Sequence, residues 1–228
     1  MYHLCHYTLK EFVVYPLLKK PTLDNEELSN YRPISNMSLI SKITEPIVKS
    51  PLTCHLSSDN LLNPHQSAYC KHHCTETALL YIHDYLIHAI GSQHVSCLCL
   101  RDLSAAFDTI DHNMLLSRLS SWFGIHGTVS NWFKSYLSSR CFRVRCSGSL
   151  SSPHDSLYGV PQGSVLGPLL FILYTTPLST LISSHSLDHH LYADLSVFPS
   201  TWFPIKSNSL TERLTTDLFL DDCQSTNS

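Results

Sequence analysis

The stretch Asp102-Leu-Ser-Ala-Ala-Phe-Asp108 follows an apolar run, and the stretch Leu191-Tyr-Ala-Asp194 comes much later in the chain. Between them lies the glycine-rich stretch Gly159-Val-Pro-Gln-Gly-Ser164. Two aspartates at the ends of neighbouring strands supply the oxygen ligands that Mg²⁺ prefers, and Mg²⁺ usually shares its shell with substrate phosphates. A pair of such ions can activate an attacking hydroxyl and neutralise a leaving phosphate, so the two aspartates are candidates for metal-dependent phosphoryl transfer. Taken singly, they also fit a helix cap at Asp102, a turn at Asp194 and a glycine turn without a ligand.

Hydrophobic periodicity predicts the elements around these stretches. Apolar residues recur on one helical face after Thr75, and Gly91 stands where a C-terminal cap belongs, so a helix is expected there. An apolar run over 95–100 predicts a buried strand that ends at Asp102. The other expected elements are a strand from Phe12 that breaks at prolines, a short helix over 41–48, helices over 114–123 (closed by Gly124), 129–137 and 166–173, and a hairpin arm over 142–146.

The composition is that of a globular chain, with 228 residues, 43% hydrophobic and 14% charged. A net charge of −3 argues against holding nucleic acid through bulk charge, so such contact needs local basic clusters. Nine cysteines, an odd number, and no basic-then-apolar leader indicate a nuclear or cytoplasmic protein that is not secreted. Prolines and hydroxyl residues interrupt the uncharged span 165–182, so no membrane partner is expected.

Together, the three stretches closely resemble the reverse transcriptase domain of non-LTR (LINE-type) retrotransposons. Upstream stretches agree: Leu17-Leu-Lys-Lys-Pro21, Asn30-Tyr-Arg-Pro-Ile-Ser35, and Gln66-Ser67 followed by Thr75-Glu-Thr-Ala-Leu79. The resemblance implies an α+β fold with the fingers and palm of a right-hand polymerase, in which an antiparallel palm sheet packs on helices. It divides the chain into a fingers-like region at 8–95, a palm-like catalytic region at 96–198 and a divergent, poorly structured tail at 199–228.

The resemblance also implies an activity, that of an RNA-directed DNA polymerase adding deoxynucleotides to a primer by two-metal phosphoryl transfer. Its partners are an RNA template, a DNA primer and deoxynucleoside triphosphates. Asp102 and Asp194 match the catalytic aspartates that hold two Mg²⁺ ions. Phe107 matches the residue that screens the sugar 2′ position, although a core aromatic is the alternative. The remaining matched residues are Gln162 and Gly163, which help position template and nucleotide, and Arg32, which meets the triphosphate with Lys19 or Lys20 assisting.

The chain departs from the family beside Asp194. The family motif reads Tyr-Ala-Asp-Asp, whereas here Leu195 follows Asp194 in a motif that is also one residue shorter. Removing a carboxylate weakens magnesium binding and leaves less negative charge to balance the ions. We therefore expect DNA synthesis by this chain to be impaired.

Further departures point the same way. Arg101 occupies a position that the family fills with an apolar strand residue, and burying an unpaired guanidinium is unfavourable. In the fingers, Ala68-Tyr69-Cys70 replaces a typical Gly-Phe-Arg, and no thumb is recognisable after Phe198. The pair in Leu220-Asp221-Asp222 lies in an unpatterned tail and is interpreted as a solvated acidic turn.

Three alternatives remain open. The chain is an inactive protein derived from a retroelement, or it binds nucleic acid without synthesis, or it is a zinc-binding module. Nucleic-acid binding would use Arg140, Arg143 and Arg145 near Trp132 and Phe142, unless these arginines form only a solvated hairpin face. Zinc would be held by Cys70-Lys-His-His-Cys74 with Cys54, His55 or His65 nearby.

Overall fold

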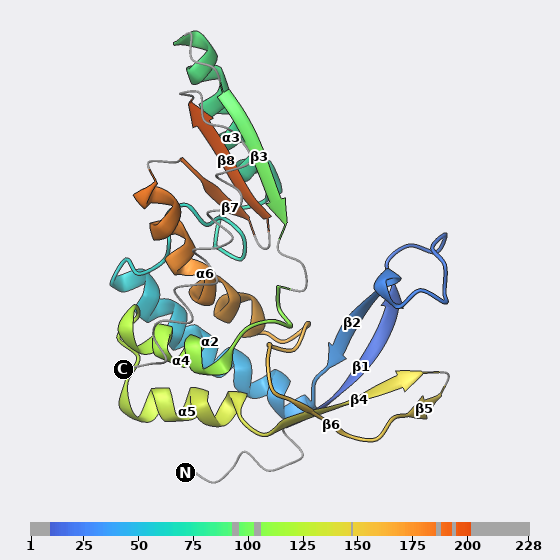
Figure 1. The fold of residues 1–228 in the computed structure, drawn as a ribbon. Helices are drawn as coiled ribbons and strands as arrows, with labels where there is room; N and C mark the ends of the chain where they lie inside the picture. The colour runs from blue at the N-terminus through green and yellow to red at the C-terminus, as the bar shows by residue number, and fades with distance from the viewer. Residues whose placement is uncertain are drawn as a thin grey trace. The chain divides into compact units, whose positions relative to one another are not determined.

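The structure is a computed structural model of the chain (Figure 1). It describes residues 10–92, 96–102, 106–146, 148–185, 188–192 and 195–201. Two units pack internally: the first contains residues 1–62 and 105–174, and the second contains residues 63–104 and 175–228. Asp194, Asp221 and Asp222 lie outside the described residues, as does most of the predicted tail.

The first unit contains a five-stranded sheet whose strands come from distant parts of the chain. Strands β2, β1, β4 and β5 follow one another in that order, and β6 also pairs with β4. Strand β1 is antiparallel to β2 and parallel to β4, and the hairpin arm predicted at 142–146 is confirmed as part of β4. The bounds are Glu11–Leu18 for β1, Tyr31–Asn36 for β2, Arg140–Cys146 for β4, Ser149–Leu150 for β5, His154–Ser156 for β6, and Leu28–Asn30 for the 3₁₀ turn η1 before β2.

Strand β1 continues through Pro16, where the sequence predicted a break. Pro16 lies directly opposite Pro33 of β2 and beyond Val14, the last residue of β1 that pairs with β4. In a non-hydrogen-bonded pair of an antiparallel ladder, both N–H groups point away from the partner strand. Two prolines that face each other fit such a pair without loss of a ladder bond, so the strand does not end there.

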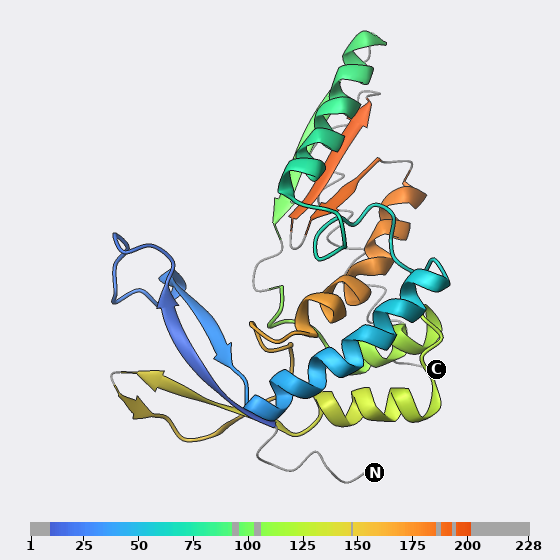
Figure 2. The ribbon, with the colours of Figure 1, turned by 180° about the vertical axis from the view of Figure 1, so that it is seen from behind.

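Helices pack together beside this sheet to form the core of the first unit, and Figure 2 shows α2 and α5 side by side. The predicted helices near 114–123 and 129–137 are confirmed, and Gly124 has the left-handed φ of +64° expected after a helix. Trp122 and Val129, two apolar residues of the predicted helices, are 42% and 51% exposed, because they lie at the end of one helix and in the first turn of the next. The bounds are Leu39–Ser58 for α2, His112–Ser121 for α4, Gly127–Leu137 for α5 and Gly167–Ser184 for α6, which passes into the second unit. The most buried core residues include Leu56, Ile110, Leu115, Leu119, Phe123, Phe133, Leu137 and Leu170.

Helix α2 is much longer than the helix predicted at 41–48, and it runs through Pro46 and Pro51. A proline inside a helix removes one backbone hydrogen bond and frees a carbonyl. Both prolines are exposed, so water can hydrate that side of the helix while the opposite side packs on the core. The buried side consists of Ser41, Glu45, Leu52 and Leu56.

The second unit contains a three-stranded antiparallel sheet of order β3-β8-β7, along which helix α3 packs (Figures 1 and 2). The predicted helix after Thr75 is confirmed, with Ala78, Ile82 and Ala89 buried, although Leu79 is exposed. No helix in the described part of the chain is long and apolar enough to cross a membrane. The bounds are Thr75–Gly91 for α3, Ser96–Asp102 for β3, His190–Tyr192 for β7 and Leu195–Thr201 for β8.

Candidate active site

The β7–β8 hairpin and the end of β3 meet at the aspartate stretches. Asp102 is the last residue of β3 and pairs with Leu195, the first residue of β8. Leu195 also pairs with Tyr192, the last residue of β7. The antiparallel sheet thus brings the chain on both sides of Asp194 to the strand end that carries Asp102, as the order of the stretches predicted.

The residue directly opposite Asp102 is a leucine, which offers no oxygen donor to a metal ion. The carboxylates of Asp102 and Asp194 are chemically suited to Mg²⁺, but the set has one carboxylate fewer than the family motif. Among the described residues, no group of three or more His, Cys, Asp or Glu side chains could hold a metal ion. Arg101 pairs with Ser196, and its side chain lies outside the described part.

Strand β7 is held along its free edge by the segment 65–67. The Leu191 N–H donates to the His65 carbonyl at 2.8 Å, and the Ser67 N–H donates to the Leu191 carbonyl at 3.1 Å. The buried His190 ring is hydrogen-bonded through Nε2 to the Ser67 hydroxyl and stacks on Tyr81 with ring centroids 4.7 Å apart. These contacts fix the strand that leads into the aspartate motif.

Histidines surround the same strand, and they affect one another. Burial lowers the pKa of His190, and the neighbouring His65, His73 and His189 lower it further. His189 is buried and hydrogen-bonded through Nε2 to the Ser179 hydroxyl at 2.6 Å. The packing around β7 therefore favours the neutral form of the His190 imidazole.

The glycine loop, residues 159–164, lies in the first unit and is held by its backbone. The Gly159 N–H donates to the Ile110 carbonyl and the Val160 N–H donates to the Phe107 carbonyl, both at 2.8 Å. The Ser35 N–H of β2 donates to the carbonyl of Gln162 at 2.9 Å. The loop therefore connects β2 with the segment that follows the first aspartate stretch.

Both glycines of this loop have left-handed backbones. Gly159 has φ +78°, and a Cβ there would lie 2.8 Å from the Asp108 Cα and from the Phe107 carbonyl oxygen. Gly163 has φ +106°, and its Cβ would lie 3.0 Å from the Ser35 carbonyl oxygen. Only glycine combines these φ values with such close backbone approach. The packing of the chain itself therefore requires glycine at both positions.

Phe107 is half-buried and stacks on Phe171 of α6, with ring centroids 5.1 Å apart. The core contact foreseen as the alternative reading is thus present. The ring is partly exposed, and the contact gives it a fixed orientation. Its role toward the sugar remains a prediction.

The predicted triphosphate-binding residues lie on the β1–β2 hairpin. Arg32 is exposed on β2 and pairs with Leu17 of β1. Lys20 is exposed in the connection between the two strands, where the Lys19 ammonium donates to the Ser29 carbonyl at 2.8 Å. Arg32 shares the first unit with Phe107 and the glycine loop, whereas Asp102 and Asp194 belong to the second.

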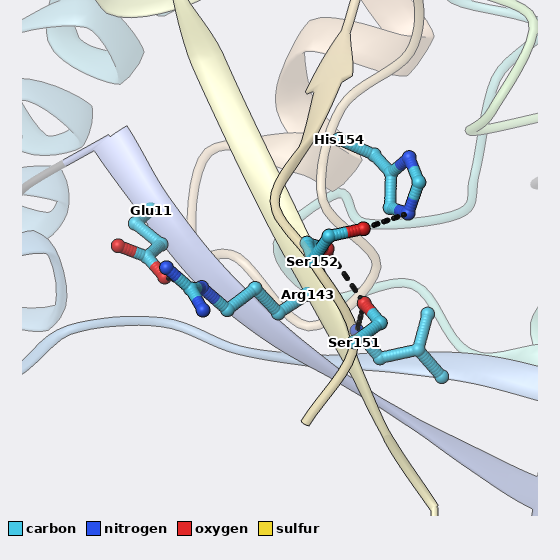
Figure 3. A network of polar contacts seen from close by, with 6 residues as sticks. Glu11, Arg143, Ser151, Ser152 and His154 are labelled. Atoms are coloured by element: carbon cyan, nitrogen blue, oxygen red, sulfur yellow. Dashed lines mark hydrogen bonds and ion pairs between the residues drawn. The ribbon is translucent and has the colours of Figure 1, made fainter. Parts of the chain in front are cut away.

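The arginine cluster predicted on the β4 hairpin needs correction. Arg140 is only 3% exposed, with its guanidinium 4.6 Å above the Tyr136 ring, because the strand begins there against α5. Arg143 is about a third exposed and forms an ion pair with Glu11 at 2.6 Å; Figure 3 shows the two side chains. Arg145 lies over the Tyr15 ring at 5.8 Å. Only Arg143 and Arg145 therefore remain for a surface role.

The cysteine and histidine cluster gives no support to a zinc module. The Cys70 thiol donates to the Gln66 carbonyl, and burial raises its pKa. Cys74 caps the start of α3, while His55 belongs to the first unit and pairs with Asp59. A separate pocket of about 520 Å³ between α2 and α5 is mostly apolar. His55 and Trp132 line it, but none of the residues predicted to hold Mg²⁺ or the polymerase substrates does.

The sequence interpretation missed Glu45, a buried carboxylate of α2. It is 1% exposed and accepts hydrogen bonds from Tyr136, Val165 and Leu166. The sequence did contain a signal for Glu45. It lies four residues after Ser41, which places both residues on the same side of an amphipathic helix, and the structure buries that side. A charged residue on such a side is uncommon unless it has partners.

Comparison with known proteins agrees with this geometry. The pattern of the family described as reverse transcriptase (RNA-dependent DNA polymerase) matches residues 18–198. A probable RNA-directed DNA polymerase from transposon BS of Drosophila melanogaster is 32% identical over 174 residues, which are 75% of this chain and 19% of that protein. The chain spans about a fifth of the length of the transposon relatives that it matches.

Solved structures are similar to the chain in fold. Apo telomerase from Candida tropicalis, truncated from its C-terminal domain, has a TM-score of 0.61 at 13% identity, over 92% of this chain and 46% of that chain. Telomerase from Candida albicans in complex with a fragment of telomeric RNA has a TM-score of 0.60 at 10% identity, over 91% and 40% of the two chains.

Proposed function

Because the chain belongs to the reverse transcriptase family, we propose that it is a catalytically impaired reverse transcriptase domain of a non-LTR retrotransposon. The predicted α+β fold of a right-hand polymerase is confirmed by its likeness to the telomerases. In this proposal the fingers are residues 8–95 and the palm is residues 96–198. The substrates are an RNA template, a DNA primer and deoxynucleoside triphosphates.

The observation that carries the proposal is the pairing of Asp102 with Leu195, the residue that follows Asp194. Asp102 and Asp194 are the residues that hold Mg²⁺, which when bound neutralises phosphate charge and activates the primer hydroxyl. Arg32 binds the triphosphate through its guanidinium, which suits phosphate oxygens. Lys19, Lys20, Gln162, Gly163 and Phe107 complete the substrate contacts.

Leu195 is the reason for the impairment. A leucine at this position removes the carboxylate that would share the metal charge, while its branched apolar side chain suits a strand. Fewer oxygen donors mean weaker magnesium binding and less stabilisation of the transferring phosphate. The fold of the active site is thus retained while its chemistry is reduced.

Primer extension on an RNA template with Mg²⁺ tests this directly. We expect little or no product from the unaltered chain and an increase of about a hundredfold or more from Leu195→Asp, the range for restoring one charge-stabilising group. Leu195→Asn is the matched control, because asparagine has the size of aspartate without its charge. It should stay close to the unaltered chain.

A second substitution distinguishes restored catalysis from DNA synthesis by a contaminating polymerase. Asp102→Asn in the Leu195→Asp background should abolish the recovered synthesis. Robust synthesis by the unaltered chain, lost on Asp102→Asn, contradicts the impairment. Failure of both the unaltered chain and Leu195→Asp assigns the defect to other departures, such as Arg101 or Ala68-Tyr69-Cys70.

A second candidate function is nucleic-acid binding without synthesis, favoured by one face of the first sheet. Register places Arg143 with Val13 and Arg32 with Leu17, so these residues share the face that carries the exposed Tyr15. Arginines interleaved with an exposed aromatic suit a phosphate backbone and its bases. Salt-dependent RNA binding that Arg145→Ala weakens, in a chain that Leu195→Asp does not activate, would favour this function.

A further inference from the structure

Glu45 is a buried carboxylate with three donors directed at it. Its Oε1 accepts a hydrogen bond from the Tyr136 hydroxyl at 2.9 Å. Its Oε2 accepts from the Val165 N–H at 2.6 Å and from the Leu166 N–H at 3.3 Å. Burial is the main cause that raises the pKa of Tyr136, so this hydroxyl remains a donor at neutral pH. Hydrogen bonds to a charged acceptor are about twice as strong as neutral ones.

The two N–H groups lie where the glycine loop leads into helix α6. Val165 and Leu166 directly follow the glycine loop, and the Leu166 carbonyl accepts the first helical hydrogen bond of α6 from the Leu170 N–H. N–H groups before a helix have no partner within it, and a negative charge there is favourable. Glu45 therefore satisfies these donors and fixes where α6 begins.

At its other points the loop is held mainly by the main chain, with one further side-chain contact from His112 Nε2 to the Gly159 carbonyl at 2.8 Å. Ile110 and Phe107 accept from its start, and Ser35 donates to the Gln162 carbonyl. Glu45 holds its far end through a side-chain charge, delivered from α2. A change at Glu45 therefore releases one end of the loop and leaves the other bonds in place.

We propose that Glu45 is a positioning residue for the substrate site, fixing the glycine loop for contact with nucleotide and template. The inference rests on the proposed function, because it assigns substrate contact to Gln162 and Gly163. Glu45 itself touches no substrate. It acts through the backbone of Val165 and Leu166.

The chain offers a matched pair of variants. Glu45→Met removes every acceptor at similar length, and Glu45→Gln keeps an acceptor but removes the charge. Tyr136→Phe removes the donor to Oε1 and leaves the contacts of Oε2 with the loop intact. If Glu45→Met fails to fold, Glu45→Gln against Tyr136→Phe still decides the question.

The first measurement is NMR-detected amide exchange at Val165 and Leu166 in the full chain. We expect exchange to rise by roughly ten- to a hundredfold in Glu45→Met, as loss of a hydrogen bond to a charged group implies. The Val165 amide proton, deshielded by the carboxylate, should shift upfield in Glu45→Gln. Tyr136→Phe should leave both signals near those of the unaltered chain, although it lowers stability.

The second measurement is the affinity for a fluorescent deoxynucleoside triphosphate with Mg²⁺. Glu45→Met or Glu45→Gln should raise the dissociation constant by on the order of tenfold, and Tyr136→Phe by less than about twofold. Unchanged exchange and amide shifts overturn the role of Glu45, as does altered exchange with unchanged affinity. No nucleotide binding by the unaltered chain overturns the proposed function instead, while the exchange data still judge the contact itself.

Discussion

The glycine loop of the first unit and the β7–β8 hairpin of the second differ in how folding constrains them. The loop lies against neighbouring backbone so closely that Gly159 leaves no space for a methyl group. The hairpin position that follows Asp194 accepts a leucine within a regular strand. The loop that we propose positions substrate is therefore part of the packing, whereas the carboxylate that the family motif has after Asp194 is not.

The difference fits the proposal that this polymerase fold has outlasted its chemistry. A side chain at Gly159 would overlap neighbouring backbone, so we expect folding itself to require glycine there. Replacement of an aspartate by leucine at the start of β8 removes a charge and adds strand propensity, so the fold tolerates it. A chain can thus retain the backbone of a polymerase site after a metal ligand has gone.

The largest effect is expected for Gly159→Ala, which tests whether the glycine loop is constrained by folding. The added methyl group would meet the backbone of Asp108 and Phe107 at 2.8 to 2.9 Å, with φ at +78°. Left-handed strain and overpacking together should lower the free energy of unfolding by about 3 kcal/mol, measured by urea denaturation.

Gly148→Ala is its matched control. Gly148 has a similar φ of +84° but open space around its Cβ, so only the strain of about 1 kcal/mol should appear. Equal losses in the two variants would show that close approach does not constrain the loop. The contrast between the tightly packed glycine loop and the tolerant strand position of Leu195 would then be wrong.

An effect of intermediate size is expected at the β7–β8 hairpin, where the pH dependence of stability is the quantity to measure. Burial and neighbouring histidines lower the pKa of His190, so the unfolded chain takes up this proton first as pH falls. Stability should therefore fall as pH drops from about 6.5, the usual histidine pKa, toward the lower folded value, and the loss should level off below it. Thermal unfolding of the unaltered chain at pH 7.5 and 5.0 measures the effect.

His190→Gln should flatten that pH dependence, because glutamine can keep a hydrogen bond to Ser67 without titrating. His83→Gln, an exposed histidine on α3, serves as the control and should leave the dependence in place. Amide exchange at pH 5 should rise in β7 more than in the glycine loop. Equal changes in both would contradict the assignment to the hairpin.

The smallest effect is expected at the Arg143–Glu11 pair, which lies on the sheet surface outside both regions. Both side chains are about a third exposed, so a double-mutant cycle of Glu11→Ala and Arg143→Ala should give a coupling of roughly 0.5 kcal/mol. Added salt should reduce it further. A coupling above about 2 kcal/mol would mean that the surface charges also hold the sheet in place.

The local sequence pattern predicted those elements whose signals, apolar periodicity and capping residues, lie within the element itself. The helix from Thr75, the turn at Gly124 and the strand that ends at Asp102 were all predicted from periodicity and caps. The strand through Pro16 was not, because its tolerance depends on Pro33 across the sheet. Likewise, the length of α2 depends on the packing of one side of the helix against the core. This packing outweighs the helix-breaking tendency of the exposed Pro46.

The site was predictable where the order of motifs carried the signal. Asp102 and the glycine loop were assigned from that order, and their roles, like those of Asp194 and Arg32, remain predictions of the same resemblance. Buried polar partners were not predictable in this way. Arg140 was taken for a surface charge and Glu45 was overlooked, since only tertiary structure shows that Tyr136 lies between them.

The outer edge of β2 has a consequence for self-association. Along this edge the Tyr31 N–H donates to the Leu28 carbonyl, Pro33 has no N–H, and the Ser35 N–H donates to Gln162. An edge strand recruits another molecule through unpaired N–H groups, and these three alternate positions present none. The edge therefore offers no donor row for a strand of a second molecule, which protects it from fibril-like stacking.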